Sequence, residues 1–295
     1  EQAPEFPAES TESTFRILTI GGSTTFGSRL ERNETYPAHL QRLLNERWPE
    51  FNPVVLNGGV PWHTSMHSLL RYVARYSEWR PNLVIVMHAY NDIAQTSEGK
   101  FTTGTYRPDY GHFFGALSTR IRPNDPFFDR LSSAVWGNWV ARTWFSDLRG
   151  GEPTRALKPV DLLRPLPVYT RNLRELGRRI ADDGGRLLIA TQIDTYNIMN
   201  RPDAPKRRLY EPYYRGFSEI PSIADQRRAM DTFNDAAKDI AKDDPRIGLI
   251  DLRANLTPDW ENFYDDVHYN ADGAKVVAAH IFKLVDWPLH FRQAN

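Results

Sequence analysis

The sequence of 295 residues contains no cysteine, which excludes disulfide bonds, thiolate metal sites and cysteine nucleophiles. No run approaches the roughly 18 consecutive apolar residues that a membrane-spanning helix needs, and the first residues show no signal-peptide pattern. Neither sign of charge is in excess, since 37 lysines and arginines balance 37 aspartates and glutamates. The chain therefore lacks the basic surface on which nucleic-acid binding depends, and we expect neither DNA nor RNA as a partner.

The first 13 residues are rich in proline, glutamate, serine and threonine, a composition that buries too little apolar surface to fold. We expect residues 1–13 to be a disordered tail or linker and residues 14–290 to form a single domain. Such a tail is typical of an exported or periplasmic protein that has lost a signal or anchor, but an arbitrary fragment boundary would look the same. We expect a soluble chain, and the sequence leaves its location and oligomeric state open.

Short apolar runs rich in β-branched residues alternate with longer amphipathic stretches, as in proteins built from βαβ units. The predicted strands are residues 15–20, 53–57, 82–88, 186–191 and 247–251. Apolar residues recur every three or four positions in the stretches between them. The predicted helices are residues 35–48, 65–79, 166–184, 222–243 and 272–285. This order predicts a three-layer α/β fold around a five-stranded parallel sheet.

Residues 98–164 are an exception, because no periodicity holds there and aromatic residues crowd together. A stretch of this length without a regular pattern is often a lid or a binding loop. The same rings could instead form the core of a small helical subdomain, since clustered aromatic residues mostly pack against one another. Both interpretations can hold together, and we treat this stretch as an insertion in the domain.

Candidate catalytic residues follow the predicted strands, at the edge where ligands collect in parallel α/β sheets. Ser23 comes directly after the first strand, Asn91 follows the third, and Asp265 and His268 precede the last predicted helix. A nucleophilic serine needs a base, an orienting carboxylate and donors for the oxyanion, and these residue types supply all three. Taken singly, each polar residue has a simpler role, because Ser, Asn and Asp commonly cap helices or stabilise turns.

Four segments together carry a resemblance to a known family. They are IGGSTTFG (20–27), NGGVPWHTS (57–65), HAYNDI (88–93) and DDVHYN (265–270). With these segments in this order, the sequence resembles the SGNH/GDSL hydrolases, a family of serine esterases and lipases. The resemblance implies a flavodoxin-like α/β/α sandwich and ester hydrolysis through an acyl-enzyme, without a metal or cofactor. It also implies that Ser23 attacks the ester, that His268 is the general base and then the general acid, and that Asp265 orients the imidazole.

The same resemblance implies an oxyanion hole made by the Ser23 amide, the Asn91 side chain and a backbone amide of the second segment. Trp62 stands where that segment usually carries glycine, so its Cβ restricts the backbone there. We expect the Trp62 N–H to donate, with Gly59 as the fallback donor, and the indole to form a wall of the acyl pocket. The alternative is that Trp62 distorts the site and impairs hydrolysis. A milder departure is Gly22, which replaces the aspartate of the family's G-D-S pattern.

We expect Trp62, His63, Tyr90 and Tyr210 to line the substrate pocket. His63 and His67 lie four positions apart, but two histidines without a nearby acidic ligand make a poor metal site. We expect the substrate to be a small-molecule or carbohydrate ester with a short acyl group such as acetyl, because Trp62 should shorten the pocket. Acyl transfer to another hydroxyl would use the same residues, and a catalytically impaired carbohydrate- or partner-binding module also remains an alternative.

Overall fold

The computed structural model describes residues 14–97, 161–198 and 221–294. The expected tail (residues 1–13), most of the aromatic insertion (98–160) and Tyr210 lie outside this part of the chain. Among the described residues, none of the helices is both long enough and apolar enough to cross a membrane.

Five parallel strands form one sheet in the order β2-β1-β3-β4-β5. The strands are β1 (Phe15–Gly21), β2 (Pro53–Asn57), β3 (Leu83–Met87), β4 (Arg186–Ala190) and β5 (Ile247–Ile250). All five predicted strands are confirmed, each to within one residue at either end. This order is that of flavodoxin-like folds, in which ligands bind beyond the carboxyl ends of the strands.

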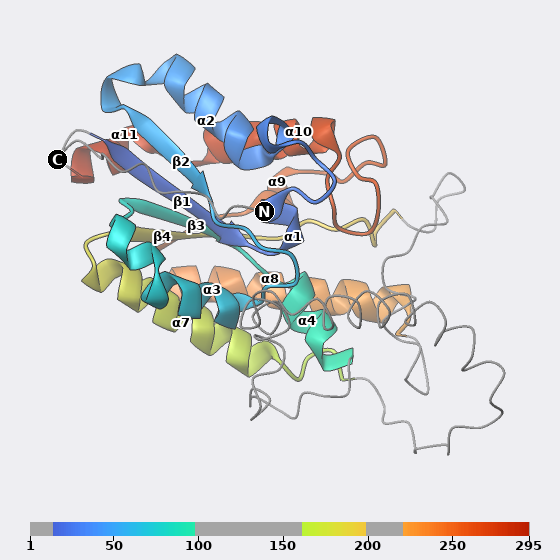
Figure 1. Ribbon diagram of the computed structural model, residues 1–295. Coiled ribbons are helices and arrows are strands. Elements are labelled where there is room, and N and C mark those ends of the chain that lie inside the picture. Colours follow the sequence, from blue (N-terminus) through green and yellow to red (C-terminus); the bar gives the residue numbers. More distant parts are fainter. Residues whose placement is uncertain (1–13, 98–160, 199–220, 295) are drawn as a thin grey trace, which may run out of the picture.

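Helices cover both faces of this sheet, which makes three layers (Figure 1). One face carries α2 (Tyr36–Arg47), α10 (Ala271–Leu284) and α11 (Trp287–Ala294). The other face carries α3 (Ser65–Ala74), α7 (Leu166–Asp182) and α8 (Ile223–Asp243). The predicted three-layer α/β fold is therefore confirmed, and α11 continues the chain past the expected domain end at residue 290.

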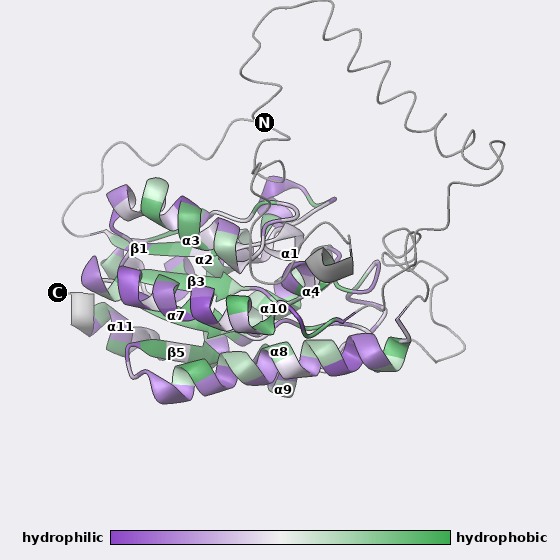
Figure 2. Cartoon of the chain, turned by 90° about the horizontal axis from the view of Figure 1, so that it is seen from below, coloured by the Kyte–Doolittle hydropathy of each residue, from purple (hydrophilic) through white to green (hydrophobic). Residues whose placement is uncertain are grey.

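Alternation along the strands gives each face its own core, because successive side chains of a strand point to opposite faces. In β1, Leu18 and Ile20 belong to the core under α3, α7 and α8, whereas Phe15 and Ile17 belong to the core under α2, α10 and α11. Figure 2 shows the resulting pattern, with hydrophobic strands behind helices that alternate between hydrophobic and hydrophilic residues. Burial on both faces explains why the strands read as nearly continuous apolar runs.

Polar side chains cap three of the long helices close to the predicted helix starts. The side chains of Thr35, Ser222 and Asn270 accept hydrogen bonds from amides in the first turns of α2, α8 and α10. Such caps satisfy amides that have no partner within the helix. The second predicted helix, residues 65–79, is longer than the observed one, because α3 ends at Ala74 and the chain continues as the 3₁₀ helix η3 (Tyr76–Trp79).

Five further short helices complete the regular secondary structure of the described residues. They are α1 (Ser23–Phe26), η1 (Arg32–Glu34), η2 (Pro49–Phe51), α4 (Tyr90–Ser97) and α9 (Leu252–Asn255). None of them was predicted, since fewer than three helical turns give little periodic signal. Two of them, α1 and α4, begin at the carboxyl edge of the sheet and carry candidate catalytic residues.

Candidate active site

The carboxyl ends of three strands lie side by side and bring distant parts of the sequence together. Gly21 of β1 pairs with Met87 of β3, and Met87 pairs with Ala190 of β4. Ser23 follows Gly21 by two residues, and Asn91 follows Met87 by four. Both side chains therefore start from the same edge of the sheet, as the parallel topology requires.

Ser23 is the first residue of α1, but its hydroxyl does not cap that helix. The N-cap is Gly22, where there is no side-chain hydrogen bond. Instead, Ser23 Oγ lies 2.7 Å from His268 Nε2, although the two residues are 245 positions apart in the sequence. The simpler role considered for Ser23, that of a helix cap, is wrong.

His268 lies between Ser23 and Asp265. Its Nδ1 is 2.9 Å from Asp265 Oδ1 and 2.8 Å from Oδ2, and both residues are buried. Burial by itself raises the pKa of the Asp265 carboxyl, but hydrogen bonds from His268 and from the amides of Val267 and His268 outweigh it. The pKa of Asp265 is therefore held below its usual value. An ionised carboxylate at this place accepts a hydrogen bond from the Nδ1–H group and leaves Nε2 unprotonated, so that Nε2 can accept the proton of the Ser23 hydroxyl.

A tight reverse turn holds Asp265 and His268 in this arrangement. An antiparallel bridge between Phe263 and Tyr269 closes the turn, and the amide of Tyr264 donates to the His268 carbonyl at 3.1 Å. Within the turn, Asp265 Oδ1 accepts from the His268 amide at 2.9 Å. The helix that follows is capped by Asn270, so the alternative role of Asp265 as a helix cap is also wrong.

Two further contacts attach this turn to the edge of the sheet. The Tyr264 hydroxyl donates to the Ser28 carbonyl at 2.9 Å, which links the turn to the loop after α1. On the other side, the Thr195 amide donates to the Asp266 carbonyl at 2.9 Å. These bonds join the turn to the loops after α1 and β4 and so help to fix the position of the imidazole beside Ser23.

Asn91 lies in the first turn of α4 and is held against Gly22. Its Nδ2 donates to the His63 carbonyl at 2.8 Å. A Cβ atom on Gly22 would come within 2.4 Å of Nδ2, so the amide packs directly over the backbone beside Ser23. Since the side-chain amide carries two N–H donors and one is used by His63, the other remains to be directed at a ligand.

Asp92 anchors α4 to α3 below Asn91. Its carboxylate accepts from the Ser65 hydroxyl at 2.6 Å and from the Ser65 amide at 3.2 and 3.1 Å. Asn172 of α7 donates to the same hydroxyl at 3.0 Å. Burial raises the pKa of Asp92 to about 7, and these hydrogen bonds only partly offset it. This buried network fixes the start of α4, and with it the position of Asn91.

The second sequence segment places Trp62 in a conformation that favours glycine. Its φ is 68°, in the left-handed region, which agrees with the glycine usually found at this position in the resembled family. The indole is 49% exposed. Gly59, the fallback donor, already donates its N–H to Asn57 Oδ1 at 3.0 Å, and a Cβ atom there would lie 2.3 Å from the Phe26 amide. Gly59 is therefore a packing residue, and its expected fallback role is not supported.

A cavity of about 130 Å³ opens beside Ser23 and His268. Its lining residues are Ser23, Ser28, Arg29, Pro61, Trp62, Tyr90, Asn91, Tyr264, Asp265 and His268. Trp62 and Tyr90 therefore lie where the sequence analysis expected them. His63 is not among these lining residues; it contributes its backbone carbonyl to Asn91, and its ring stacks on that of His67 with centroids 4.6 Å apart.

Four lining residues, Ser28, Arg29, Pro61 and Tyr264, were missed by the sequence analysis. The Tyr264 ring stacks on the His268 imidazole, with centroids 5.4 Å apart and an interplanar angle of 3°. The Arg29 guanidinium lies over the same tyrosine ring, 4.9 Å from its centroid. The available signal for Tyr264 was its position directly before Asp265, whereas the turn that carries Arg29 has no pattern of its own.

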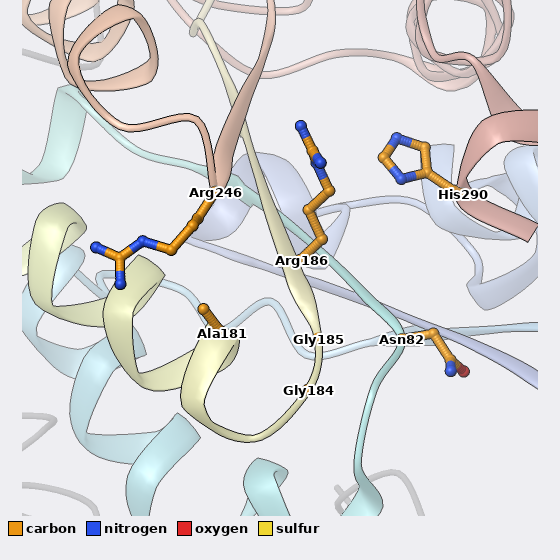
Figure 3. A pocket seen from close by; sticks show the side chains of 7 residues that line it. All are labelled: Asn82, Ala181, Gly184, Gly185, Arg186, Arg246 and His290. Carbon is orange, nitrogen blue, oxygen red and sulfur yellow. The ribbon is translucent and has the colours of Figure 1, made fainter. Parts of the chain in front are cut away.

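A second and larger cavity, of about 290 Å³, lies at the opposite edge of the sheet, near the amino ends of β3, β4 and β5. Its lining residues are Asn82, Ala181, Gly184, Gly185, Arg186, Arg246 and His290 (Figure 3). None of the candidate catalytic residues lines it. Across residues 14–97, 161–198 and 221–294, no three side chains of the metal-ligating types are grouped so that they could hold a metal ion.

A comparison of the sequence with protein families matches the GDSL-like lipase/acylhydrolase family over residues 19–276. The chain belongs to this family. It is therefore a serine ester hydrolase, and the expected SGNH/GDSL resemblance is confirmed. The matched range includes all four sequence segments and every residue of the Ser23, His268 and Asp265 arrangement. A comparison with curated proteins gave no significant match.

Solved structures of esterases share the fold of this GDSL-family chain. The acetylxylan esterase Axe2 from Geobacillus stearothermophilus is 17% identical over 92% of this chain and 94% of its own, with a TM-score of 0.52. The acetyl xylan esterase AlAXEase is 12% identical over 91% of this chain and 98% of its own, with a TM-score of 0.53. At these identities the likeness establishes the fold, and not the substrate.

Proposed function

We propose that the protein hydrolyses short-chain carboxylic esters, with acetyl groups on carbohydrates as the preferred class, through an acyl-enzyme on Ser23. The observation that carries the proposal is the continuous hydrogen-bonded series from Ser23 Oγ through His268 to the Asp265 carboxylate. Each member has the chemistry that its place demands, since a hydroxyl faces an imidazole nitrogen and a carboxylate holds the other nitrogen.

In the first half of the reaction, Ser23 Oγ attacks the ester carbonyl carbon and its proton passes to His268 Nε2. The resulting oxyanion accepts hydrogen bonds from the Ser23 amide, the Asn91 side chain and the Trp62 amide. His268 then gives its proton to the alcohol oxygen as the carbon–oxygen bond breaks. The alcohol leaves and the acyl group stays on Ser23.

In the second half, a water molecule attacks the acyl-enzyme while His268 takes one of its protons. The tetrahedral intermediate collapses, the carboxylic acid leaves, and the proton returns to Ser23 Oγ. Asp265 stays ionised throughout and stabilises the imidazolium that forms in each half.

The cavity supports a small acyl group. Its volume is about 130 Å³, and Trp62 and Tyr90 contribute bulky walls next to Ser23. A long lipid chain would need an extended apolar channel instead. The acetylxylan esterases with the same fold act on acetyl groups according to their names, which agrees with this size argument.

Turnover of p-nitrophenyl acetate and of acetylated xylooligosaccharides tests the proposal. We expect Ser23→Ala to abolish both activities and to prevent labelling by a fluorophosphonate probe, because the attacking oxygen is gone. Ser77→Ala is the matched control, since its hydroxyl lies on η3 near the Val73 carbonyl and away from the cavity. Equal turnover by Ser23→Ala and the native chain would overturn the mechanism. Binding of the sugar without turnover or labelling would favour a binding module instead.

A further inference from the structure

Two residues that line the catalytic cavity have a backbone conformation that L-amino acids rarely adopt. Among the described residues, non-glycine residues with positive φ are Arg29 (67°), Asn52 (43°), Trp62 (68°) and Arg80 (49°). Asn52 and Arg80 follow the 3₁₀ helices η2 and η3 as C-caps, where a left-handed residue is ordinary. Arg29 and Trp62 have no such role, and both line the cavity beside Ser23. Strain of this kind tends to collect where a side chain must point at a ligand.

Arg29 brings an uncompensated positive charge to this cavity. It is exposed, and within the described ranges no carboxylate forms an ion pair with its guanidinium. The one carboxylate that lines the cavity, Asp265, is occupied by His268 and by two backbone amides. Arg29 instead lies over the Tyr264 ring, a contact that orients a guanidinium and leaves its N–H groups available.

The position of this charge relative to Ser23 indicates which part of a substrate it meets. The cavity is small enough that the acyl group fills the space next to Ser23. Arg29 and Trp62 are the two exposed residues among those that line the cavity, so we assign both to its mouth. A group at the mouth belongs to the alcohol portion of the ester, which stays outside while the acyl group is transferred. An aromatic surface next to a guanidinium suits a ring that carries a carboxylate.

We propose that Arg29 is a specificity-determining residue that binds a carboxylate on the alcohol portion of the substrate, so that acylated acidic sugars are preferred over neutral ones. This inference rests on the proposed esterase function and names its substrate class. The proposed ion pair between Arg29 and the substrate carboxylate is separate from the hydrogen bonds that the ester carbonyl receives during hydrolysis.

A pair of acetate esters with nearly identical shape tests the inference. We compare kcat/KM for 4-acetoxybenzoate, which carries a carboxylate, with kcat/KM for the neutral 4-acetoxybenzamide. We expect Arg29→Gln to lower the ratio of these two values by about fivefold, the upper range for an exposed ion pair. Arg29→Lys should retain part of the preference, and added salt should reduce the preference of the native chain because it screens exposed charges.

Arg80→Gln is the matched control, because it removes another arginine with positive φ that does not line the cavity. It should leave the ratio unchanged. If Arg29→Gln lowers both values equally, Arg29 acts only by supporting Tyr264, and the inference is overturned. An unchanged ratio in Arg29→Gln overturns it as well.

Labelling of Ser23 by the fluorophosphonate probe separates this inference from the proposed function. Absence of labelling in the native chain would contradict the esterase mechanism itself. With labelling intact, protection of Ser23 by 4-hydroxybenzoate relative to 4-hydroxybenzamide repeats the charge comparison without turnover. Equal protection by the two compounds would overturn the role of Arg29 while leaving the esterase mechanism in place.

Discussion

The two edges of the parallel sheet each hold a cavity, and the larger one lies at the edge without the proposed catalytic residues. The cavity at the amino edge has a volume of about 290 Å³, against about 130 Å³ at the carboxyl edge. Both contain titratable side chains. Cavity volume and charge content by themselves would therefore point to the wrong edge.

The edges differ in what their polar groups bind. At the carboxyl edge, Ser23 comes from a segment far in sequence from the turn that carries His268 and Asp265, and the three residues form one hydrogen-bonded series. At the amino edge, Arg246 is paired with its near neighbour Asp244 at 2.7 Å, and its side chain points away from Arg186 and His290 (Figure 3). The site of chemistry is therefore indicated by catalytic side chains that are hydrogen-bonded to one another, and not by the volume of a cavity.

Replacement of Asp265 would give the largest contrast between the edges. We expect Asp265→Asn to lower kcat for p-nitrophenyl acetate by roughly 10³-fold or more, because an amide holds the imidazole in the wrong tautomer. Asp286→Asn makes the same chemical change at an exposed position near His290, at the amino edge. It should leave kcat within about twofold. Comparable losses in the two variants would show that the edges are not functionally distinct.

Asn91 and Asn82 allow the same comparison of the two edges, with a smaller expected loss of kcat at the carboxyl edge. We expect Asn91→Ala to lower kcat by about 10²-fold with little change in KM, because an oxyanion donor acts mainly in the transition state. Asn82→Ala is the counterpart at the amino edge, where Oδ1 accepts from the Arg16 amide at 2.8 Å. That variant should lose about 1 kcal/mol in the free energy of unfolding and keep its kcat. A kcat unchanged by Asn91→Ala would remove this residue from the oxyanion hole.

Much of the carboxyl edge could be predicted from the sequence, because the residues there follow strands. Five short apolar runs predicted five strands, and parallel strands bring the residues that follow them to one edge. The types of Ser23, Asn91, Asp265 and His268 then suggested a chemistry. The turn around Asp265 and His268 could not be derived in this way, because its bridge, its amide contacts and its attachment to other loops are tertiary.

The amino edge and the cavity mouth gave no such signal. Arg29 lies in a turn whose backbone conformation depends on packing around it, and sequence periodicity carries no information about a single left-handed residue. Gly59 was expected only as the fallback donor, although glycine permits close approach of other groups. The structure uses that close approach for packing against Phe26 instead. A glycine in a loop therefore indicates that another group packs closely against its backbone, but it does not indicate whether that group is a ligand or part of the protein.

His290 provides the smallest expected effect and the sharpest test of the amino edge. Burial and the charge of Arg186 lower the pKa of its imidazole below the ordinary value of 6.5. The folded state then binds fewer protons than the unfolded state at acidic pH, so the free energy of unfolding falls as pH drops below about 6.5. His290→Gln removes this titration. The variant should lose less stability than the native chain between about pH 7.5 and pH 5 in urea unfolding, with kcat/KM within about twofold of native. A large loss of activity would instead give the amino edge a role in catalysis, and an unchanged pH dependence would contradict the lowered pKa.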